Sequence, residues 1–454
     1  MMVYSLYSSN MYNQSSMITN KNSSSSSSLK PIFNFDVDQT VAKYAKSSTS
    51  PIVVSLIKDN NAATYTYGDT NPTLAGTQLP TAQTLIPIGS VSKIFTTTLL
   101  ADMVKRGDID LNAPVKNYLP SDVKLPTFQG KEITVQDLAT HTSGLPSTNM
   151  PNSTIDKLYK ALGSITLSST PGKDYKYSSI GTALLGEALG NAYAKATGTK
   201  YTPEESYKTA LQTLVLNPLG LTNTKTNLTD SEKSQLPSGN NNGTNINPST
   251  NQPFVASGGI YSTADDLVKF IKANIDAEDK AKQGKPLTEI ESAMVMAQNP
   301  IYSNITATAE NGADQVGLSW YTKDDDVVLK TGSIPGFNSI IKFSKKNDTG
   351  VFISMGNTAM KPGALSDDLL KQLNGTKTIT TKDKAGKVTG QTNYKPNGSI
   401  DYKYTTTYKA DGGFINNYTH YNGKADKYTN VYDKNSNLIS QTNYKPNGSI
   451  DYKW

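Results

Sequence analysis

The stretch IPIGSVSKIFTTTLL, residues 86–100, places Ser90 and Lys93 three positions apart where a helical pattern of apolar residues begins. At a helix start the free backbone N–H groups favour negative charge on the serine oxygen, and a lysine one turn later lies on the same helix face. A partly desolvated lysine there could accept the serine proton. The spacing alone does not exclude a capping serine beside a surface lysine, because Ser27 and Lys30 have the same separation.

The composition excludes several kinds of chemistry. The chain has 454 residues and no cysteine, which excludes disulfides, thiol nucleophiles and cysteine-ligated metals. Its two histidines, His141 and His420, are too few for a histidine-rich zinc site. We interpret Asp265-Asp266 as a helix start and Asp324–Asp326 as a turn, so we expect no metal and no cofactor. If the protein is a hydrolase, its general base is then Lys, Tyr, Asp or Glu.

The net charge of +6 lies in the C-terminal segment. From Thr376 onward there are twelve lysines and six aspartates, an excess of six, so residues 1–375 are neutral overall. No run of 18 apolar residues is present, and we expect neither a membrane span nor a nucleic-acid partner. The first twenty residues contain no apolar stretch long enough for the core of a signal peptide.

The sequence predicts three regions. Residues 1–30 end in a run of serines and have little to bury, which predicts a disordered leader. Residues 31–375 have globular patterning, with strand patterns near both ends and helical patterns between them, which predicts one antiparallel sheet built from chain-distant segments and flanked by helices. The predicted strands cover 51–59, 63–69, 326–332, 338–346 and 350–357, and the predicted helices include 36–47, 90–107 and 365–375.

The third region, residues 376–454, contains a repeat. QTNYKPNGSIDYK occurs at 391–403 and again, without a change, at 441–453. Tyrosines mark degenerate units between the two copies, and each unit has the pattern strand, Asn-Gly or Asp-Gly turn, strand. This predicts β-hairpin repeats, which must associate with one another because an isolated hairpin is barely stable.

Two further segments carry polar residues suited to a site. PGKDYKYSSIGTALLGEAL supplies Tyr177 and Ser179 in a loop that enters an apolar helix. VVLKTGSIPGF supplies Lys330, Thr331 and Gly332 on a predicted strand. The lysine and the threonine can bind a carboxylate, and the glycine would let a substrate approach the strand closely.

The set S-x-x-K, Tyr-x-polar and K-T-G, in this order, resembles the penicillin-recognising serine hydrolases, and class C β-lactamases with the related carboxypeptidases and esterases fit best. Three more segments support the resemblance, which covers about residues 36–375: ITVQDLATHTSGLP at 133–146, NPLGLTNT at 217–224 and ASGGIYSTADDLVKF at 256–270. It implies an α/β (α+β) fold of the β-lactamase/transpeptidase type, with an all-helical insert.

The resemblance also implies roles for residues at matching positions. Ser90 would be the acylated nucleophile, and Lys93 and Tyr177 would share the work of the general base. The backbone N–H groups of Ser90 and Ser333 would form the oxyanion hole. Lys330 and Thr331 would hold a substrate carboxylate, and His141 would belong to the scaffold.

One residue departs from the family pattern. The family usually has asparagine two residues after the tyrosine, whereas this chain has Ser179. An amide accepts from the lysine and donates to the substrate at once, which a hydroxyl does less well. We therefore expect the serine to make β-lactam turnover less efficient but to leave the acylation machinery intact.

Two functions remain open at this point. The first is a serine hydrolase that cleaves amide or ester bonds in D-amino-acid peptides, β-lactams or small esters. The second is a weak or inactive homologue that serves as a surface or cell-wall binding protein through its tail. The lysine-rich tail could bind an anionic cell-wall or glycan polymer, or it could be a solvated spacer whose lysines prevent aggregation. Family members often work outside the cytoplasm, so the resemblance implies an extracytoplasmic or secreted location, although the sequence shows no export signal.

Overall fold

The computed structural model contains two compact units, Asp36–Leu370 and Lys371–Trp454; Phe33 and Phe35 group with the second. The division falls within α11 (Pro362–Asn374), a few residues before the boundary predicted at residue 375. The structure describes residues 13–15, 33, 35–45, 49–58, 61–71, 78–147, 154–248, 255–303, 305, 312–324, 326–375, 377–384, 386–394, 400–421, 425–436, 438–445 and 449–453.

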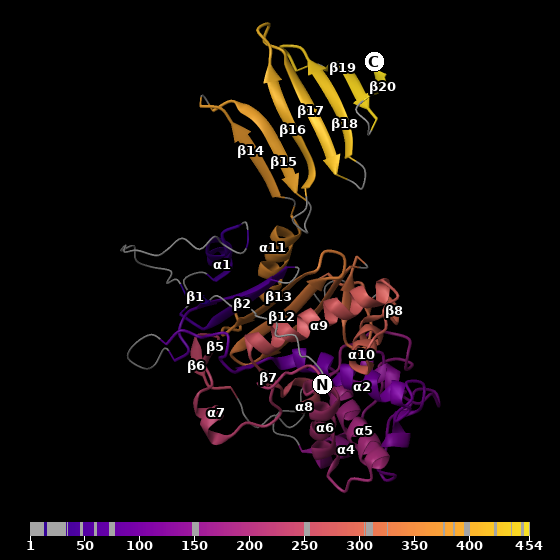
Figure 1. Cartoon of the computed structure of the whole chain (residues 1–454). Coiled ribbons are helices and arrows are strands. Elements are labelled where there is room, and N and C mark those ends of the chain that lie inside the picture. The colour runs from indigo at the N-terminus through magenta and orange to yellow at the C-terminus, as the bar shows by residue number, and fades with distance from the viewer. Residues whose placement is uncertain are drawn as a thin grey trace, which may run out of the picture. The chain divides into compact units, whose positions relative to one another are not determined.

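The first unit is built on a nine-stranded sheet whose strands come from distant parts of the chain (Figure 1). Along the sheet the strands are β1 (Asn13–Ser15), β3 (Asn61–Tyr67), β2 (Ile52–Lys58), β13 (Thr349–Met355), β12 (Phe337–Ser344), β11 (Val327–Ile334), β10 (Tyr321–Lys323), β9 (Gln315–Val316) and β8 (Tyr302–Ser303). β2 pairs with β13, with Ile57 opposite Gly350, so the two ends of the unit meet in the middle of the sheet. The predicted antiparallel sheet is confirmed, apart from β1, which pairs parallel to β3.

Helices cover both faces of this sheet, so its central strands are buried on both sides. α9 (Ala264–Lys282) packs on β2, β12 and β13, where Gly350 leaves room for Ile271. On the opposite face the buried Lys342 of β12 binds Asp367 of α11 at 2.6 Å. β2 and β13 are therefore nearly continuous apolar runs and not alternating ones.

The segment between β3 and β8 is mainly helical, but it is not the all-helical insert that the resemblance implies. Two small sheets interrupt it, β4 (Ile86–Pro87) with β7 (Tyr261–Ser262) and β5 (Gly239–Asn241) with β6 (Thr244–Ile246). Its helices are η1 (Gly89–Val91), α2 (Ser92–Arg106), η2 (Val115–Tyr118), α3 (Val135–Ala139), α4 (Ile155–Leu162), α5 (Ser179–Thr197), α6 (Pro203–Leu211), η3 (Gln212–Leu216), α7 (Asp230–Ser234), α8 (Val255–Gly258), α9 and α10 (Glu289–Gln298).

α2 is the central helix of this unit. It starts from the short 3₁₀ turn η1 and ends, as predicted, at Gly107, which has a left-handed conformation. The sequence suggested one apolar face, but every residue from Ser92 to Met103 is buried. The reason is that α5, α6, α8 and α10 surround the helix and bury its polar side chains too.

The second unit contains one seven-stranded antiparallel sheet in which the strands follow chain order (Figure 1). The predicted hairpins therefore join edge to edge. In both copies of QTNYKPNGSIDYK the register shifts by one residue at the same place, between Asn393 and Tyr394 and between Asn443 and Tyr444. The strands are β14 (Lys377–Lys382), β15 (Val388–Tyr394), β16 (Ile400–Tyr408), β17 (Phe414–Tyr421), β18 (Ala425–Tyr432), β19 (Leu438–Tyr444) and β20 (Ile450–Lys453).

Aromatic rings cross neighbouring strands on one face of this tail sheet. The rings of Tyr418 and Tyr428 stack with centroids 4.6 Å apart, and Tyr404 lies 5.1 Å from Tyr418. A second stack joins Phe414 and Tyr432 at 4.6 Å. Cross-strand pairs of this kind stabilise a sheet that has little apolar core of its own.

Two predictions fall largely on residues that are not described. Apart from β1, the predicted leader 1–30 lies outside the described residues, as do the Asn-Gly turns of both repeat copies. None of the helices in the described ranges combines the length and the apolarity that a membrane crossing requires.

A chain that ends at Gly375 is expected to fold and to hydrolyse a small ester at the rate of the full chain. The nine strands, the helices and every candidate site residue precede that position. Thermal unfolding and ester hydrolysis by both chains measure this. Loss of soluble protein on truncation would show that the tail completes the fold of the first unit.

A second prediction concerns the pH dependence of stability. Glu187 of α5 is buried beside the Tyr159 hydroxyl, 3.4 Å away, and burial, with the charge of Glu204, raises the pKa of Glu187 to about 7. The folded protein then holds a proton that the unfolded chain loses above about pH 4.5, so this group lowers stability as pH rises from about 4.5 to 7, by about 2–3 kcal/mol. Glu187→Gln is expected to flatten this decline in urea unfolding. An unchanged decline would contradict the assignment.

Candidate active site

The hydroxyl of Ser90 lies between two groups that can exchange protons. Lys93 Nζ is 3.2 Å from Ser90 Oγ, and the Tyr177 hydroxyl is 2.6 Å from the same oxygen. A serine hydroxyl has one proton to donate, so whichever partner is deprotonated can accept it while the other donates. The structure thus brings together the three residues that the sequence proposed for the chemistry.

Two glycines let β11 approach the segment that carries Ser90. Gly89 has φ +54°, and a Cβ there would lie 2.9 Å from Ser333 N. A Cβ at Gly332 would lie 2.1 Å from Ile88 O and 2.4 Å from Ser339 Oγ. A side chain at position 332 would therefore collide with the Ile88 carbonyl and the Ser339 hydroxyl, which explains this glycine by packing within the protein. The expectation that Gly332 lets a substrate approach the strand stays a prediction.

Lys93 is fully buried, and three oxygens surround its ammonium group. Besides Ser90 Oγ, its Nζ contacts Ser179 Oγ at 3.4 Å and donates to the carbonyl of Ser257 in α8. Ser179 therefore lies beside Lys93, as the sequence proposed. Ser257 was not singled out from the sequence, because a backbone carbonyl can come from any residue type and leaves no pattern.

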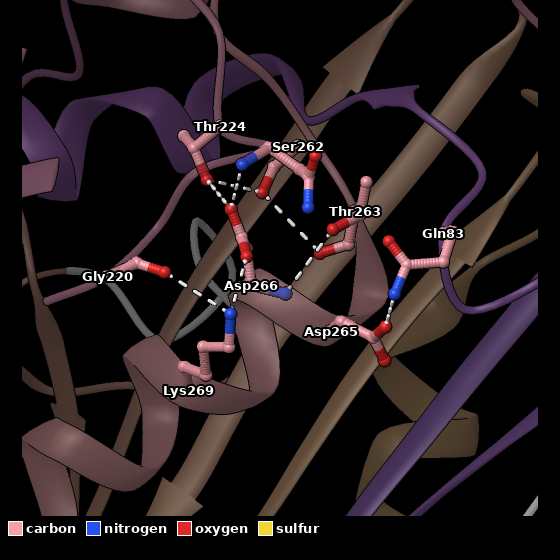
Figure 2. Close-up of polar contacts among 9 residues, drawn as sticks. Gln83, Gly220, Thr224, Ser262, Thr263, Asp265, Asp266 and Lys269 are labelled. Carbon is pink, nitrogen blue, oxygen red and sulfur yellow. Dashed lines mark hydrogen bonds and ion pairs between the residues drawn. The ribbon is translucent and has the colours of Figure 1, made fainter. Parts of the chain in front are cut away.

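Buried polar contacts hold the segment after Ser257 in place (Figure 2). Asp266, in the first turn of α9, accepts from the Asn223 backbone N–H at 2.7 Å and from Thr224 Oγ1 at 3.1 Å. Gln83 donates to Asp265, which ties the same turn to the chain segment that leads into β4 and Ser90. These contacts join the segment 217–224 to the segment 256–270. Asp265 and Asp266 lie in the first turn of α9, so the predicted helix start is confirmed.

The same segment is also bonded directly to the start of α2. The Ile88 N–H donates to Ile260 O at 3.2 Å, and the Ile260 N–H donates to Ser92 Oγ at 3.1 Å. Both bonds meet at Ile260, three residues after Ser257, and tie the segment that carries the Ser257 carbonyl to the chain on either side of η1, just before Lys93.

Tyr177 is held by the N-terminus of α5 and by His141. Ser178 caps the helix by accepting from the Gly181 N–H at 3.0 Å, and its own N–H donates to His141 Nδ1 at 3.3 Å. The His141 ring lies 4.6 Å from the Tyr177 ring. Burial and the nearby charges of Lys330 and Lys93 hold the pKa of His141 well below its usual range, so the imidazole is neutral and serves as scaffold.

Lys330 of β11 is also fully buried, and aromatic rings surround its ammonium group. Its Nζ lies 5.0 Å from the centre of the Tyr177 ring and 4.1 Å from that of Tyr321 in β10. Tyr321 was missed from the sequence, since only the pairing of β10 with β11 brings it to the lysine.

The side chains that follow Lys330 on β11 are more exposed than the lysine. Thr331 is half-buried and Ser333 is exposed, whereas Lys330 has no exposed surface. Thr331 and Ser333 are therefore the side chains of this segment that solvent can reach. The binding of a substrate carboxylate by Lys330 and Thr331 stays a prediction.

Comparisons with known proteins identify the family of this chain. The sequence model of the Beta-lactamase family matches residues 37–374. The D-alanyl-D-alanine-carboxypeptidase/endopeptidase AmpH of Escherichia coli K12 is 24% identical over 354 residues, 74% of this chain and 88% of that protein. A β-lactamase of the same strain is 24% identical over 347 residues, 69% of this chain and 86% of that protein.

Solved structures share the fold of the first unit. A β-lactamase/D-alanine carboxypeptidase from Yersinia pestis, complexed with citrate, has a TM-score of 0.61 at 24% identity and covers 74% of this chain and 97% of its own. A class C β-lactamase has a TM-score of 0.62 at 20% identity, with 75% and 97% covered. The family match spans most of the chain and stops before the tail sheet. The chain therefore belongs to the Beta-lactamase family, a family of serine hydrolases.

Proposed function

We propose that this protein hydrolyses an amide or ester bond through an acyl intermediate on Ser90. The observation that carries the proposal is the position of Ser90 Oγ, 2.6 Å from the Tyr177 hydroxyl and 3.2 Å from Lys93 Nζ. A nucleophile within hydrogen-bond reach of its base, with the base held by further contacts, is the arrangement that nucleophilic catalysis needs.

In the acylation step, Ser90 Oγ attacks the substrate carbonyl carbon and gives its proton to the Tyr177–Lys93 pair. The carbonyl oxygen becomes an oxyanion, which the N–H groups of Ser90 and Ser333 would stabilise. Collapse of this intermediate breaks the bond to the leaving group, which takes the proton from the pair. Water then attacks the acyl-serine with the same base and releases the acid product and free Ser90.

Three observations support the substrate class of D-amino-acid peptides, β-lactams or small esters. Thr331 and Ser333 are accessible beside the buried cation of Lys330, which suits a substrate with a terminal carboxylate. Ser179 lies at the lysine, next to the place where the substrate amide would lie. AmpH and the Yersinia pestis protein are named as carboxypeptidases that act on D-alanine or D-alanyl-D-alanine.

The weak or inactive binding protein remains the alternative, and the contacts of Ser90 favour the hydrolase over it. For the tail we keep the proposal that it binds an anionic cell-wall or glycan polymer. Its sequence has twelve lysines against six aspartates, and Lys403 and Lys427 are exposed on its strands. An extracytoplasmic location would bring both parts to such a substrate and polymer.

Acylation is expected at Ser90 and at no other serine. A fluorescent penicillin should label the full chain, and mass mapping should place the adduct on Ser90. Ser90→Ala should abolish the label and lower ester hydrolysis by about a thousandfold or more. Ser92→Ala is the matched control, because this neighbouring hydroxyl accepts from Ile260 N and is expected to matter for stability only. A label that survives Ser90→Ala would contradict the mechanism.

The second prediction tests the serine that replaces the family asparagine. Ser179→Asn adds an N–H₂ donor beside the substrate amide and keeps an acceptor for Lys93. One hydrogen bond made better in the transition state contributes about 1 kcal/mol, several-fold in rate. We expect kcat/KM to rise more for amide or β-lactam substrates than for small esters. Equal or lower amide turnover by a folded variant would show that Ser179 suits a different substrate.

A further inference from the structure

The Lys330 ammonium group lies close to two aromatic rings. The side chain has no exposed surface, and its Nζ lies 4.1 Å from the centre of the Tyr321 ring and 5.0 Å from that of the Tyr177 ring. A cation above the face of an aromatic ring is attracted by the ring's quadrupole, more strongly when both are out of water. Tyr321 gives the shorter of these two contacts.

Tyr321 is itself fixed on several sides. Its ring is fully buried in a small apolar cluster with Val316 and Leu329, its register partners on the neighbouring strands. Its hydroxyl lies 2.7 Å from the hydroxyl of Tyr175, and the two rings meet edge to face, with centroids 6.2 Å apart. Tyr175 precedes Tyr177 by two residues, so the same loop carries the Ser90 partner and the Tyr321 partner.

We propose that Tyr321 is a positioning residue that holds the Lys330 ammonium group beside Tyr177, so that the deprotonated phenol is favoured when it takes the Ser90 proton. This rests on the proposed hydrolase function and adds to it a residue that no sequence pattern marks. Within the described part of the chain, the charged and titratable groups with a contact to the Tyr177 ring are Lys93, 5.1 Å from its centre, Lys330, and His141. Since His141 is neutral, moving Lys330 away removes one of two cations.

The test removes the ring of Tyr321 but keeps a long apolar side chain in its place. Tyr321→Phe keeps the ring and loses only the hydroxyl pair with Tyr175, whereas Tyr321→Met loses the ring. We expect Tyr321→Met to lower kcat/KM at neutral pH about tenfold and Tyr321→Phe less than about threefold. The rising limb of the pH profile should move to higher pH in Tyr321→Met, because the phenolate loses a nearby cation, and should stay in place in Tyr321→Phe.

Two substrates separate this role from carboxylate binding. Nitrocefin carries a carboxylate and p-nitrophenyl acetate does not. If Tyr321 positions a charge for Tyr177, both substrates lose rate and both profiles shift in Tyr321→Met. A loss confined to nitrocefin and seen in KM would overturn the proposal, because Lys330 would then act by binding the carboxylate.

Controls distinguish positioning from packing. Val316→Ala leaves a cavity in the same cluster, so it should lower Tm without moving the pH profile. Incorporation of 3,4,5-trifluorophenylalanine at position 321 keeps the ring shape but weakens its attraction for a cation, so its kcat/KM should fall below that of Tyr321→Phe even if Tyr321→Met does not fold. Wild-type rates and profiles in the folded variants would overturn the positioning role alone. A wild-type protein that Ser90 labelling shows to be inert would overturn the hydrolase proposal as well.

Discussion

The site depends on the close approach of β11 to the segment that precedes α2. Gly332 has no side chain where Ile88 O and Ser339 Oγ lie, and Gly89 takes a left-handed conformation beside Ser333 N. A methyl group at either glycine would lie 2.1–2.9 Å from these atoms and would force the strand and the Ser90 turn apart. Glycine at both positions therefore lets the Ser90 turn and the K-T-G segment lie side by side.

A second constraint is the burial of two cations beside one phenol. Lys93 and Lys330 have no exposed surface, and both ammonium groups lie about 5 Å from the Tyr177 ring. Buried charges need compensation, which Lys93 finds in the Ser257 carbonyl and the two serine hydroxyls and Lys330 finds in part in aromatic rings. The same two charges, together with burial, keep His141 neutral, so the histidine can support the Tyr177 loop without adding a third charge.

The tail sheet is stabilised by different interactions from those of the first unit. Among the described residues, the fully buried apolar side chains end at Leu373, before the tail begins. Its strands are held by main-chain ladders and by ring stacks such as Tyr418 with Tyr428 and Phe414 with Tyr432. Neighbouring rings face one another along the sheet, so much of their stacking surface is already used within the tail. This favours a structural role for the tyrosines and leaves the exposed lysines for any polymer partner.

Local sequence determined those features that depend on neighbours along the chain. The helical period brings Ser90 and Lys93 within reach of each other, Gly107 ends α2, and alternating tyrosines and turn residues mark the hairpins of the tail. The order of the motifs, through the family resemblance, also predicted that Ser90, Tyr177 and Lys330 lie close together. Only the tertiary structure decided which contacts form between segments that are distant in the sequence. Strand register brought Tyr321 to Lys330, hydrogen bonds at Ile260 tied the Ser257 segment to the start of the helix that carries Lys93, and helix packing buried α2 on every side. These contacts depend on how whole helices and strands pack against one another. A backbone carbonyl, or a tyrosine outside any motif, has no local sequence pattern from which such a contact can be predicted.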